Sequence, residues 1–337
     1  MDFIPESDVE LKRQMPEASK ALGAEVVFET INANDLQARI TAAIQSGAGA
    51  DIFNFQYNWA HLYQNAVADV SDVANELGKA EGGFYEIFPP SCNVNGKWLA
   101  LPHSIVGNAV AYRKSWLKDA GASEYPKTWD AALKLFPALK KNGKPYGQTL
   151  GHTFGDAPTF TYPMLWAFGG AETDKTGKKV VLNSKGAIDS VKFMQSFWKD
   201  SCDEGGLAWD DTNNNRAFHA GEISATLNGA SIYIVAKRQK DKIKDEKGEP
   251  MVRDIQHARL PAGPAGSSSY QASFHHGVMK YGKNQNLAKD FLKWLHGKEQ
   301  FGKWFEIENG YTVGATKFWE NHPMWERVDE ALRPFRT

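Results

Sequence analysis

The stretch from residue 25 to residue 55 alternates between strand and helix signals, and this pattern limits the folds open to the chain more than any other feature. EVVFETI (25–31) is rich in β-branched residues and predicts a strand. Apolar residues recur every four positions over 32–47 and a glycine ends the run, which predicts an amphipathic helix. ADIFNF (50–55) predicts a second strand. A strand, a helix and a strand at this spacing favour an α/β fold with a mainly parallel sheet.

Length and charge narrow the class of protein. A chain of 337 residues favours two domains, since a single core rarely grows so large. The 39 basic and 40 acidic residues nearly cancel, and no basic run is interleaved with aromatic residues as a nucleic-acid surface requires. The longest apolar stretches are far shorter than the roughly 20 residues that span a bilayer. We therefore expect neither a nucleic-acid partner nor membrane insertion.

Sequence motifs for catalysis, cofactors and metals are missing. There is no phosphate-binding glycine loop, no nucleophile elbow and no zinc-binding helix. Adjacent histidines on a strand point to opposite faces, so His275 and His276 do not both bind one ion, and we expect no metal and no cofactor. The acidic pairs at 210–211 and 306–308 leave a carbohydrate-active hydrolase open as an alternative. Whether Cys92 and Cys202 form a disulfide also stays open.

The strand at 50–55 is followed by an unusual group of amides and aromatic residues. In open parallel sheets, ligands bind beyond the carboxyl ends of the strands. The side chains in that position here are Gln56, Tyr57, Asn58 and Trp59. Aromatic residues make up 12% of the chain, and many stand beside Gly, Asn or His rather than inside apolar runs. This loop is a candidate ligand site; the alternative is that its rings pack the helix that follows.

Six segments, in order along most of the chain, carry a family resemblance. They are NDLQARITAAIQSGAGADIFNF, LPHSIVGNAVAYRKSWLKDAGASEYPKTWDAALKL, LWAFGGAETDKTGKKVVLNSKGAIDSVKFM, AFHAGEISATLNGAS, LPAGPAG and KYGKNQNLAKDFLKWLHGKEQ. In these segments the chain resembles the family 1 extracellular solute-binding proteins, the sugar-binding kind that serves an ABC importer.

The resemblance implies a type II-like periplasmic binding protein fold with two α/β lobes, each a mainly parallel sheet flanked by helices, and a ligand cleft between them. It implies a periplasmic, non-catalytic, monomeric protein whose lobes close on the ligand by a hinge and which delivers the ligand to a membrane permease. Lobe one is expected at 1–108 plus 262–306, and lobe two at 109–261 plus 307–337. Relative to the family, both ends of the chain are expected to be shortened.

The resemblance also assigns residues to the cleft. The family's usual Gly-Trp after LPAGPAG is replaced here by His275-His276-Gly277, so the ligand is not fixed by it. The expected ligand-binding residues are Gln56, Tyr57, Asn58, Trp59, His103, Ser104, Trp166, Asn228, Phe274 and His275, with Glu6 and Tyr311 as weaker candidates.

Neutral hydroxyl-rich ligands suit this set best, because aromatic planes stack on sugar rings and amides bond their hydroxyl groups. We therefore expect a carbohydrate or polyol as the ligand. Glycerol 3-phosphate would require clustered Arg or Lys, and a polyamine several carboxylates; both remain alternatives.

Overall fold

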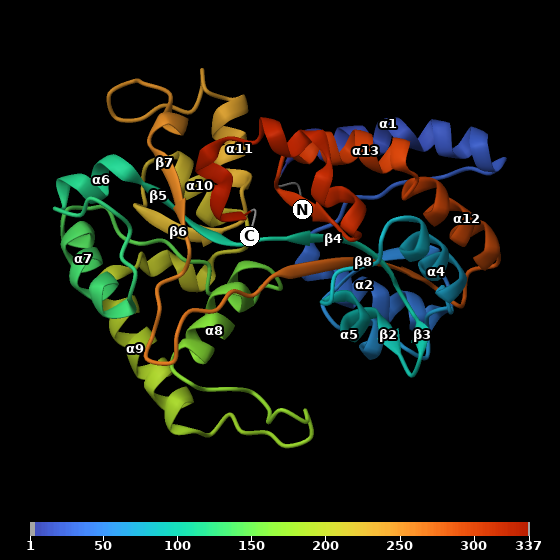
Figure 1. The fold of residues 1–337 in the computed structure, drawn as a ribbon, viewed down its shortest axis with the longest axis horizontal. Helices are drawn as coiled ribbons and strands as arrows, with labels where there is room; N and C mark the ends of the chain where they lie inside the picture. Colours follow the sequence, from blue (N-terminus) through green and yellow to red (C-terminus); the bar gives the residue numbers. More distant parts are fainter. Residues whose placement is uncertain (1–3, 336–337) are drawn as a thin grey trace. The chain divides into compact units, whose positions relative to one another are not determined.

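The structure, a computed structural model, describes residues 4–335, and these divide into two compact units (Figure 1). Unit 1 contains the residues up to Val106 and Ala272–Val328, and unit 2 contains Gly107–Gln271 and the residues from Asp329 onward. The sequence placed everything after 306 in lobe two. Residues 307–328 belong to unit 1 instead, because the strand Thr312–Gly314 pairs with Leu101–Val106. The second crossing of the chain lies at 271–272, about ten residues later than the expected boundary at 262.

Unit 1 is built around a four-stranded sheet in the order β1-β8-β4-β9, with a separate β2-β3 hairpin. Its strands are β1 (Ile52–Gln56), β2 (Asn93–Val94), β3 (Lys97–Trp98), β4 (Leu101–Val106), β8 (Ala272–Val278) and β9 (Thr312–Gly314). Its helices are α1 (Pro5–Leu22), α2 (Ala33–Ser46), α3 (Trp59–Leu62), α4 (Ser71–Ala80), α5 (Phe88–Cys92), α12 (Gln285–Leu295) and α13 (Lys298–Glu308), followed by the 3-10 turns η3 (Lys317–Asn321) and η4 (Pro323–Arg327).

The helix expected at 32–47 forms as α2 for local reasons that the sequence carries. The Asn32 side chain accepts a hydrogen bond from Asn34 N at the start of the helix. Gly47 ends it with a φ of 66°, a left-handed conformation that glycine adopts at little cost. Leu36 and Ile40 are buried, as their spacing predicts. The strand expected at 50–55 forms as β1.

Unit 2 contains a three-stranded sheet in the order β6-β5-β7. Its strands are β5 (Ala109–Arg113), β6 (Ala225–Asn228) and β7 (Ile255–Ala258). Its helices are α6 (Lys114–Asp119), α7 (Trp129–Lys141), α8 (Asp156–Ala167), α9 (Lys185–Ser201), α10 (Asn213–His219) and α11 (Ser231–Arg238), with 3-10 turns η1 (Glu204–Ala208), η2 (Met251–Arg253) and η5 (Glu330–Phe335).

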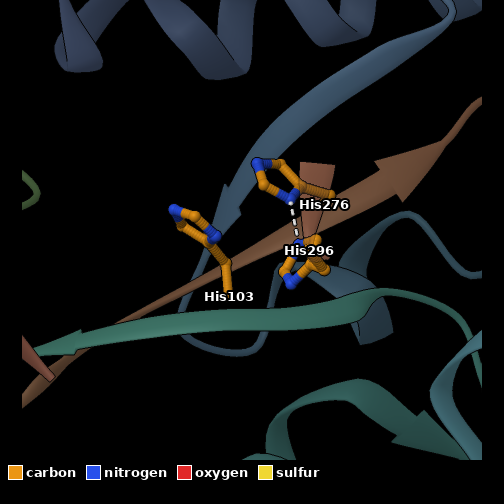
Figure 2. A group of neighbouring side chains, drawn as sticks. All are labelled: His103, His276 and His296. Carbon is orange, nitrogen blue, oxygen red and sulfur yellow. Dashed lines mark hydrogen bonds between the residues drawn. The ribbon is translucent and has the colours of Figure 1, made fainter. Parts of the chain in front are cut away.

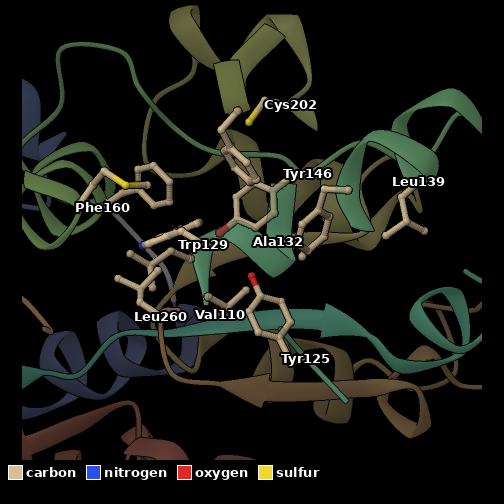
Figure 3. Close-up of a cluster of buried hydrophobic side chains, with 14 of the residues drawn as sticks. Val110, Tyr125, Trp129, Ala132, Leu139, Tyr146, Phe160, Cys202 and Leu260 are labelled. Carbon is tan, nitrogen blue, oxygen red and sulfur yellow. The ribbon is translucent and has the colours of Figure 1, made fainter. Parts of the chain in front are cut away.

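An aromatic core fills unit 2 between the sheet and helices α7, α8 and α9 (Figure 3). Trp129 lies inside it, with ring centroids 5.9 Å from Phe160 and 5.5 Å from Phe197, both edge-to-face. Tyr146 packs edge-to-face on Phe197 at 5.3 Å. Trp129 is only 2% exposed, which makes it part of this core.

The expected parallel pairing is wrong for the named strands. Every pair of them in residues 4–335 is antiparallel, and parallel pairing is confined to isolated bridges such as Tyr146 with Ala225. The segment 25–31, expected to be a strand, is extended chain that pairs with no strand among the described residues, and Val27 is largely exposed. A strand requires a neighbour for its backbone hydrogen bonds, which composition alone does not supply.

Cys92 in unit 1 and Cys202 in unit 2 are both buried and unpaired. Among residues 4–335, no helix combines the length and the apolar character needed to cross a membrane.

Candidate functional site

Three expected ligand residues lie in one row across the sheet of unit 1. Phe274 of β8 is paired with Gln56 of β1 on one side and with Ser104 of β4 on the other. Residues directly opposite each other on neighbouring strands face the same side of a sheet. Phe274 is half-buried, whereas Gln56 and Ser104 are buried. Within the described residues Gln56 Oε1 has no hydrogen-bond partner, so the row holds an unused amide oxygen beside a ring.

The loop after β1 divides into two parts. Tyr57 has a φ of 50°, its N donates to Ser273 O at 3.0 Å, and it is half-buried. Asn58 is exposed at the start of α3. Trp59 is only 3% exposed, and its ring packs at 6.4 Å from that of Phe55 inside unit 1. The Trp59 ring therefore makes a core contact in this structure, which is the alternative to the expected stacking on a ligand.

Both expected histidines are buried within unit 1. The His275 ring bonds through Nε2 to Tyr57 O at 2.9 Å and stands edge-on to Phe88 at 5.5 Å. Burial lowers the pKa of His275 to about 3. The His103 ring packs against Trp304 at 4.7 Å, and burial together with neighbouring histidines lowers the pKa of His103 well below its usual value. Neither ring is presented to solvent.

The two weaker candidates lie at the ends of helices in unit 1. Glu6 is exposed in the first turn of α1. Tyr311 is half-buried just before β9, and its N donates to Glu308 O at 2.9 Å. The structure does not bring Glu6 into the row described above, and both remain predictions.

In unit 2 the predicted residue Trp166 belongs to a group of three half-buried rings, which we call the aromatic trio: Tyr162, Trp166 and Tyr270. Ring centroids are separated by 5.8 Å from Tyr162 to Trp166, which are nearly parallel at 19°, by 5.3 Å from Tyr162 to Tyr270, and by 5.8 Å from Trp166 to Tyr270. Trp166 Nε1 donates to Glu172 Oε2 at 3.1 Å. Burial, then the nearby Tyr162 and Glu172, raise the pKa of Tyr270 to about 12. The trio therefore combines a broad aromatic surface with a carboxylate at its edge.

Sequence reasoning missed Tyr162 and Tyr270. One signal was available: Tyr162 and Trp166 are four residues apart on α8, so they share a helix face. Tyr270 comes from a distant loop, held by Asn108 Nδ2, which donates to Tyr270 O at 2.9 Å. Nothing in the spacing of the sequence indicates that neighbour.

Asn228 ends β6 in an amide network within unit 2. Its Nδ2 donates to Asn215 Oδ1, and its Oδ1 accepts from Gly229 N at 2.7 Å. Asn215 Nδ2 in turn donates to Ser231 Oγ at 3.0 Å. Because its donor and acceptor are both engaged, Asn228 supports the loop here, and its binding role remains a prediction.

The acidic pairs that left a hydrolase open have structural partners. Asp211 accepts from the backbone N of Gly155 at 3.1 Å and of Asp156 at 2.9 Å. This arrangement places a carboxylate at the N-terminus of α8, where it is stabilised by free N–H groups. Glu308 accepts a hydrogen bond from Ser7 Oγ. Asp211 lies in unit 2 and Glu308 in unit 1.

Asp156, buried beside Asp211, makes stability depend on pH. Burial, followed by repulsion from Asp211, raises the pKa of Asp156 well above its usual value, while Asn214 Nδ2 donates to its Oδ2 at 2.6 Å. A carboxyl whose pKa is raised in the folded state stabilises the fold fully below the unfolded value near 4. That contribution is lost as the pH rises through the folded pKa.

Asp156→Asn should therefore raise the melting temperature at pH 7.5, because it removes a carboxyl whose ionisation is opposed by burial and keeps an oxygen for Asn214. We expect a gain of about 1 kcal/mol or more, which corresponds to roughly 2–4 °C. The difference from wild type should vanish near pH 4. Thermal unfolding at both pH values tests this, with Asp119→Asn at an exposed site as the control. An unchanged or lower melting temperature at pH 7.5 would contradict it.

Comparison with known proteins identifies the family to which the chain belongs. The model of the bacterial extracellular solute-binding protein family matches residues 10–300. The chain belongs to this family.

Its two-lobe periplasmic binding protein fold is shared by solved structures. One is the maltose-bound MalE3 of T. maritima, with a TM-score of 0.78 and 19% identity over 96% of this chain and 82% of that one. Another is a solute-binding protein of Thermotoga lettingae bound with α-D-tagatose, with a TM-score of 0.80 and 16% identity over 96% and 84%.

The GacH receptor of Streptomyces glaucescens, studied unliganded and with acarbose, has a TM-score of 0.79 and 19% identity over 98% of this chain and 83% of that one. Among curated proteins, a probable amino-acid ABC transporter periplasmic-binding protein of Sinorhizobium fredii is 22% identical over 82% of this chain. A probable ABC transporter-binding protein of Deinococcus radiodurans is 22% identical over 76%. The chain spans about three fifths of the length of these two relatives, 63% and 61%.

Proposed function

We propose that the protein is the solute-binding component of an ABC importer, and that its ligand is a neutral carbohydrate or polyol. Membership of the bacterial extracellular solute-binding proteins supports a non-catalytic role in the periplasm and delivery to a membrane permease. We expect a monomer whose lobes close on the ligand by a hinge.

The aromatic trio of unit 2 is the observation that carries the choice of ligand. Three half-buried rings within 5.8 Å of one another form a surface on which the C–H face of a sugar ring can stack. Glu172, at the Trp166 edge, offers an acceptor for a hydroxyl group. A few polar groups around an apolar surface are typical of small-molecule sites.

The row in unit 1 is a second group of residues that we propose for ligand binding. Gln56 supplies an unused oxygen, Phe274 a ring, and Asn58 an exposed amide. We leave Trp59, His103 and His275 outside the proposed site, because their rings are buried in unit 1.

The relatives differ in what their names state. The MalE3 structure contains maltose, the GacH receptor was studied with acarbose and the T. lettingae protein contains tagatose, which supports a carbohydrate. The S. fredii relative is named for amino acids. A ligand screen therefore has to include sugars, polyols, amino acids, glycerol 3-phosphate and polyamines.

Calorimetric titration of the purified chain with this panel tests the proposal, and we expect a sugar or polyol to bind most tightly. Trp166→Ala should weaken that ligand by about 10- to 100-fold, because it removes roughly 1.5–3 kcal/mol of aromatic burial. Tyr270→Ala should act in the same direction. Phe318→Ala, which removes an exposed ring of unit 1, is the matched control and should leave the affinity unchanged.

Three outcomes would contradict the proposal. Tightest binding of an amino acid, glycerol 3-phosphate or a polyamine would replace the ligand class. Equal binding by wild type and Trp166→Ala would remove the trio from the site. Hydrolysis of aryl glycosides by the wild-type chain would favour the hydrolase alternative instead.

A further inference from the structure

Three histidines from separate segments converge inside unit 1 (Figure 2). His103 comes from β4, His276 from β8, and His296 directly follows α12. One ring nitrogen of each can be chosen so that all three lie within 4.8 Å of one another. His276 Nδ1 and His296 Nε2 are 3.2 Å apart. His275, by contrast, contacts Phe88, so only one of the two adjacent histidines belongs to this cluster.

An irregularity in the sheet accompanies the cluster. The register of β4 against β8 shifts between Pro102 and Ser104, which leaves His103 without a partner residue on β8. Such bulges often redirect a side chain next to a functional site. The ring of His103 lies 4.6 Å from that of His276 and 5.2 Å from that of His296, measured between centroids.

A hydrogen bond between two imidazoles explains only part of the arrangement. His276 and His296 satisfy each other, but His103, 9% exposed, has a buried Nδ1 with no hydrogen-bond partner among residues 4–335. The rings of Phe301 and Trp304 cover His103 at 5.3 Å and 4.7 Å and provide no acceptor. A buried polar atom without a partner costs free energy, and a bound ion is one recognised way to satisfy it.

We propose that His103, His276 and His296 bind one divalent transition-metal ion, with Zn²⁺ the best fit. Two nitrogens at about 2.0–2.1 Å from a tetrahedral ion are roughly 3.3 Å apart, close to the 3.2 Å between His276 and His296. Since the chosen nitrogens of the three histidines lie within 4.8 Å of one another, the widest pair has to close by at most about 1.5 Å to reach the same geometry.

The type of ligand atom indicates which metal ions the cluster can bind. Imidazole nitrogens suit Zn²⁺, Cu²⁺ and Ni²⁺, whereas Mg²⁺ and Ca²⁺ prefer oxygen ligands. The group of candidate ligands contains no carboxylate. Three imidazoles leave a fourth position for water, and His276 is only half-buried, which keeps one side of the cluster near solvent.

Equilibrium dialysis of the untagged, chelator-treated full chain against ZnCl₂, with metal content measured by mass spectrometry, tests the site. We expect one Zn²⁺ per chain and none retained from MgCl₂. His103→Gln, His276→Gln and His296→Gln should each weaken Zn²⁺ binding more than about 100-fold, since loss of a supporting residue alone costs 10- to 100-fold. His61→Gln, a histidine of unit 1 outside the cluster, is the control and should bind as wild type does.

A second measurement covers variants that do not fold. X-ray absorption at the zinc edge of the wild-type protein should show imidazole ligands at about 2.0–2.1 Å, and Co²⁺ in place of Zn²⁺ should give the visible bands of tetrahedral nitrogen ligation. Absence of stoichiometric Zn²⁺, a first shell without imidazole, or equal uptake by the folded variants overturns the proposal. Because the cluster lies in unit 1 and shares no residue with the proposed sugar site, its failure leaves the carbohydrate proposal untouched.

Discussion

Replacing Arg113 by leucine should destabilise unit 2 by about 3–5 kcal/mol, the loss expected when a buried ion pair loses one partner. The Arg113 side chain at the end of β5 is fully buried. Its Nε donates to Asp254 Oδ2 at 2.8 Å, and its Nη2 donates to Glu246 Oε2 at 2.9 Å. Its guanidinium carbon lies 4.5 Å from the centroid of the Trp116 ring. Leucine fills part of the volume and leaves the Asp254 carboxylate without its cation.

The cost comes from Asp254 more than from Glu246. Asp254 is buried and also accepts from Ser115 N at 2.7 Å and Ser115 Oγ at 2.6 Å, so it cannot turn toward water without losing the start of α6. Glu246 is half exposed and regains water when the arginine is lost. The double variant Arg113→Leu with Asp254→Asn should therefore recover part of the stability, because no buried charge remains.

Urea unfolding followed by circular dichroism measures the effect. Arg253→Leu is the matched control, since Arg253 pairs with Glu249 at 2.8 Å on the surface of the same unit. Exposed pairs of this kind contribute about 0.2–1 kcal/mol. A similar small loss in Arg113→Leu, or a further loss in the double variant, would show that the buried pair does not hold this region together.

Local signals in the sequence predicted individual helices and strands better than they predicted which strands pair with each other. Gly47 and the apolar spacing of residues 32–47 predicted α2, and the run at 50–55 predicted β1. The run at 25–31 has equal strand propensity, yet it pairs with no strand of the described chain. Propensity describes one segment, whereas a strand depends on a neighbour that only the fold provides.

The candidate site residues also differ in ways that local sequence does not predict. Trp59 and Trp166 both stand next to small or polar residues, and the sequence assigned both to the ligand. In the structure Trp59 packs on Phe55 in a core, while Trp166 lies half-buried beside Tyr270. Side-chain burial depends on which distant elements cover a position, so the neighbouring residues alone do not separate the two tryptophans.

The histidine cluster could not be predicted from the sequence for a related reason. Adjacent His275 and His276 were judged by their own spacing, which correctly separated them onto different neighbours. The other cluster members, His103 and His296, come from another strand and from the end of a helix. Only a sheet register with a bulge brings them together, and no motif spacing encodes that bulge.

The aromatic core of unit 2 gives the second large effect: Trp129→Ala should cost about 3–5 kcal/mol, the usual range for removing a buried aromatic side chain. The ring contacts Phe160, Phe193 and Phe197 at centroid distances of 5.5–5.9 Å, all edge-to-face. Removing it leaves a cavity that these rings cannot fill without leaving their own positions (Figure 3). Trp129→Phe should cost less, since one ring and its edge contacts are retained.

Urea unfolding of the two variants and of Ile188→Ala separates packing from general sensitivity to substitution. Ile188 lies on α9 of the same unit and is 47% exposed, so its truncation should change stability by no more than about 0.5 kcal/mol. The expected order of loss is Trp129→Ala, then Trp129→Phe, then Ile188→Ala. Because the trio of Tyr162, Trp166 and Tyr270 contains none of the altered residues, folded Trp129→Phe should still bind the best ligand of the screen. Equal losses in Trp129→Ala and Ile188→Ala would mean that the core of unit 2 does not depend on the tryptophan ring.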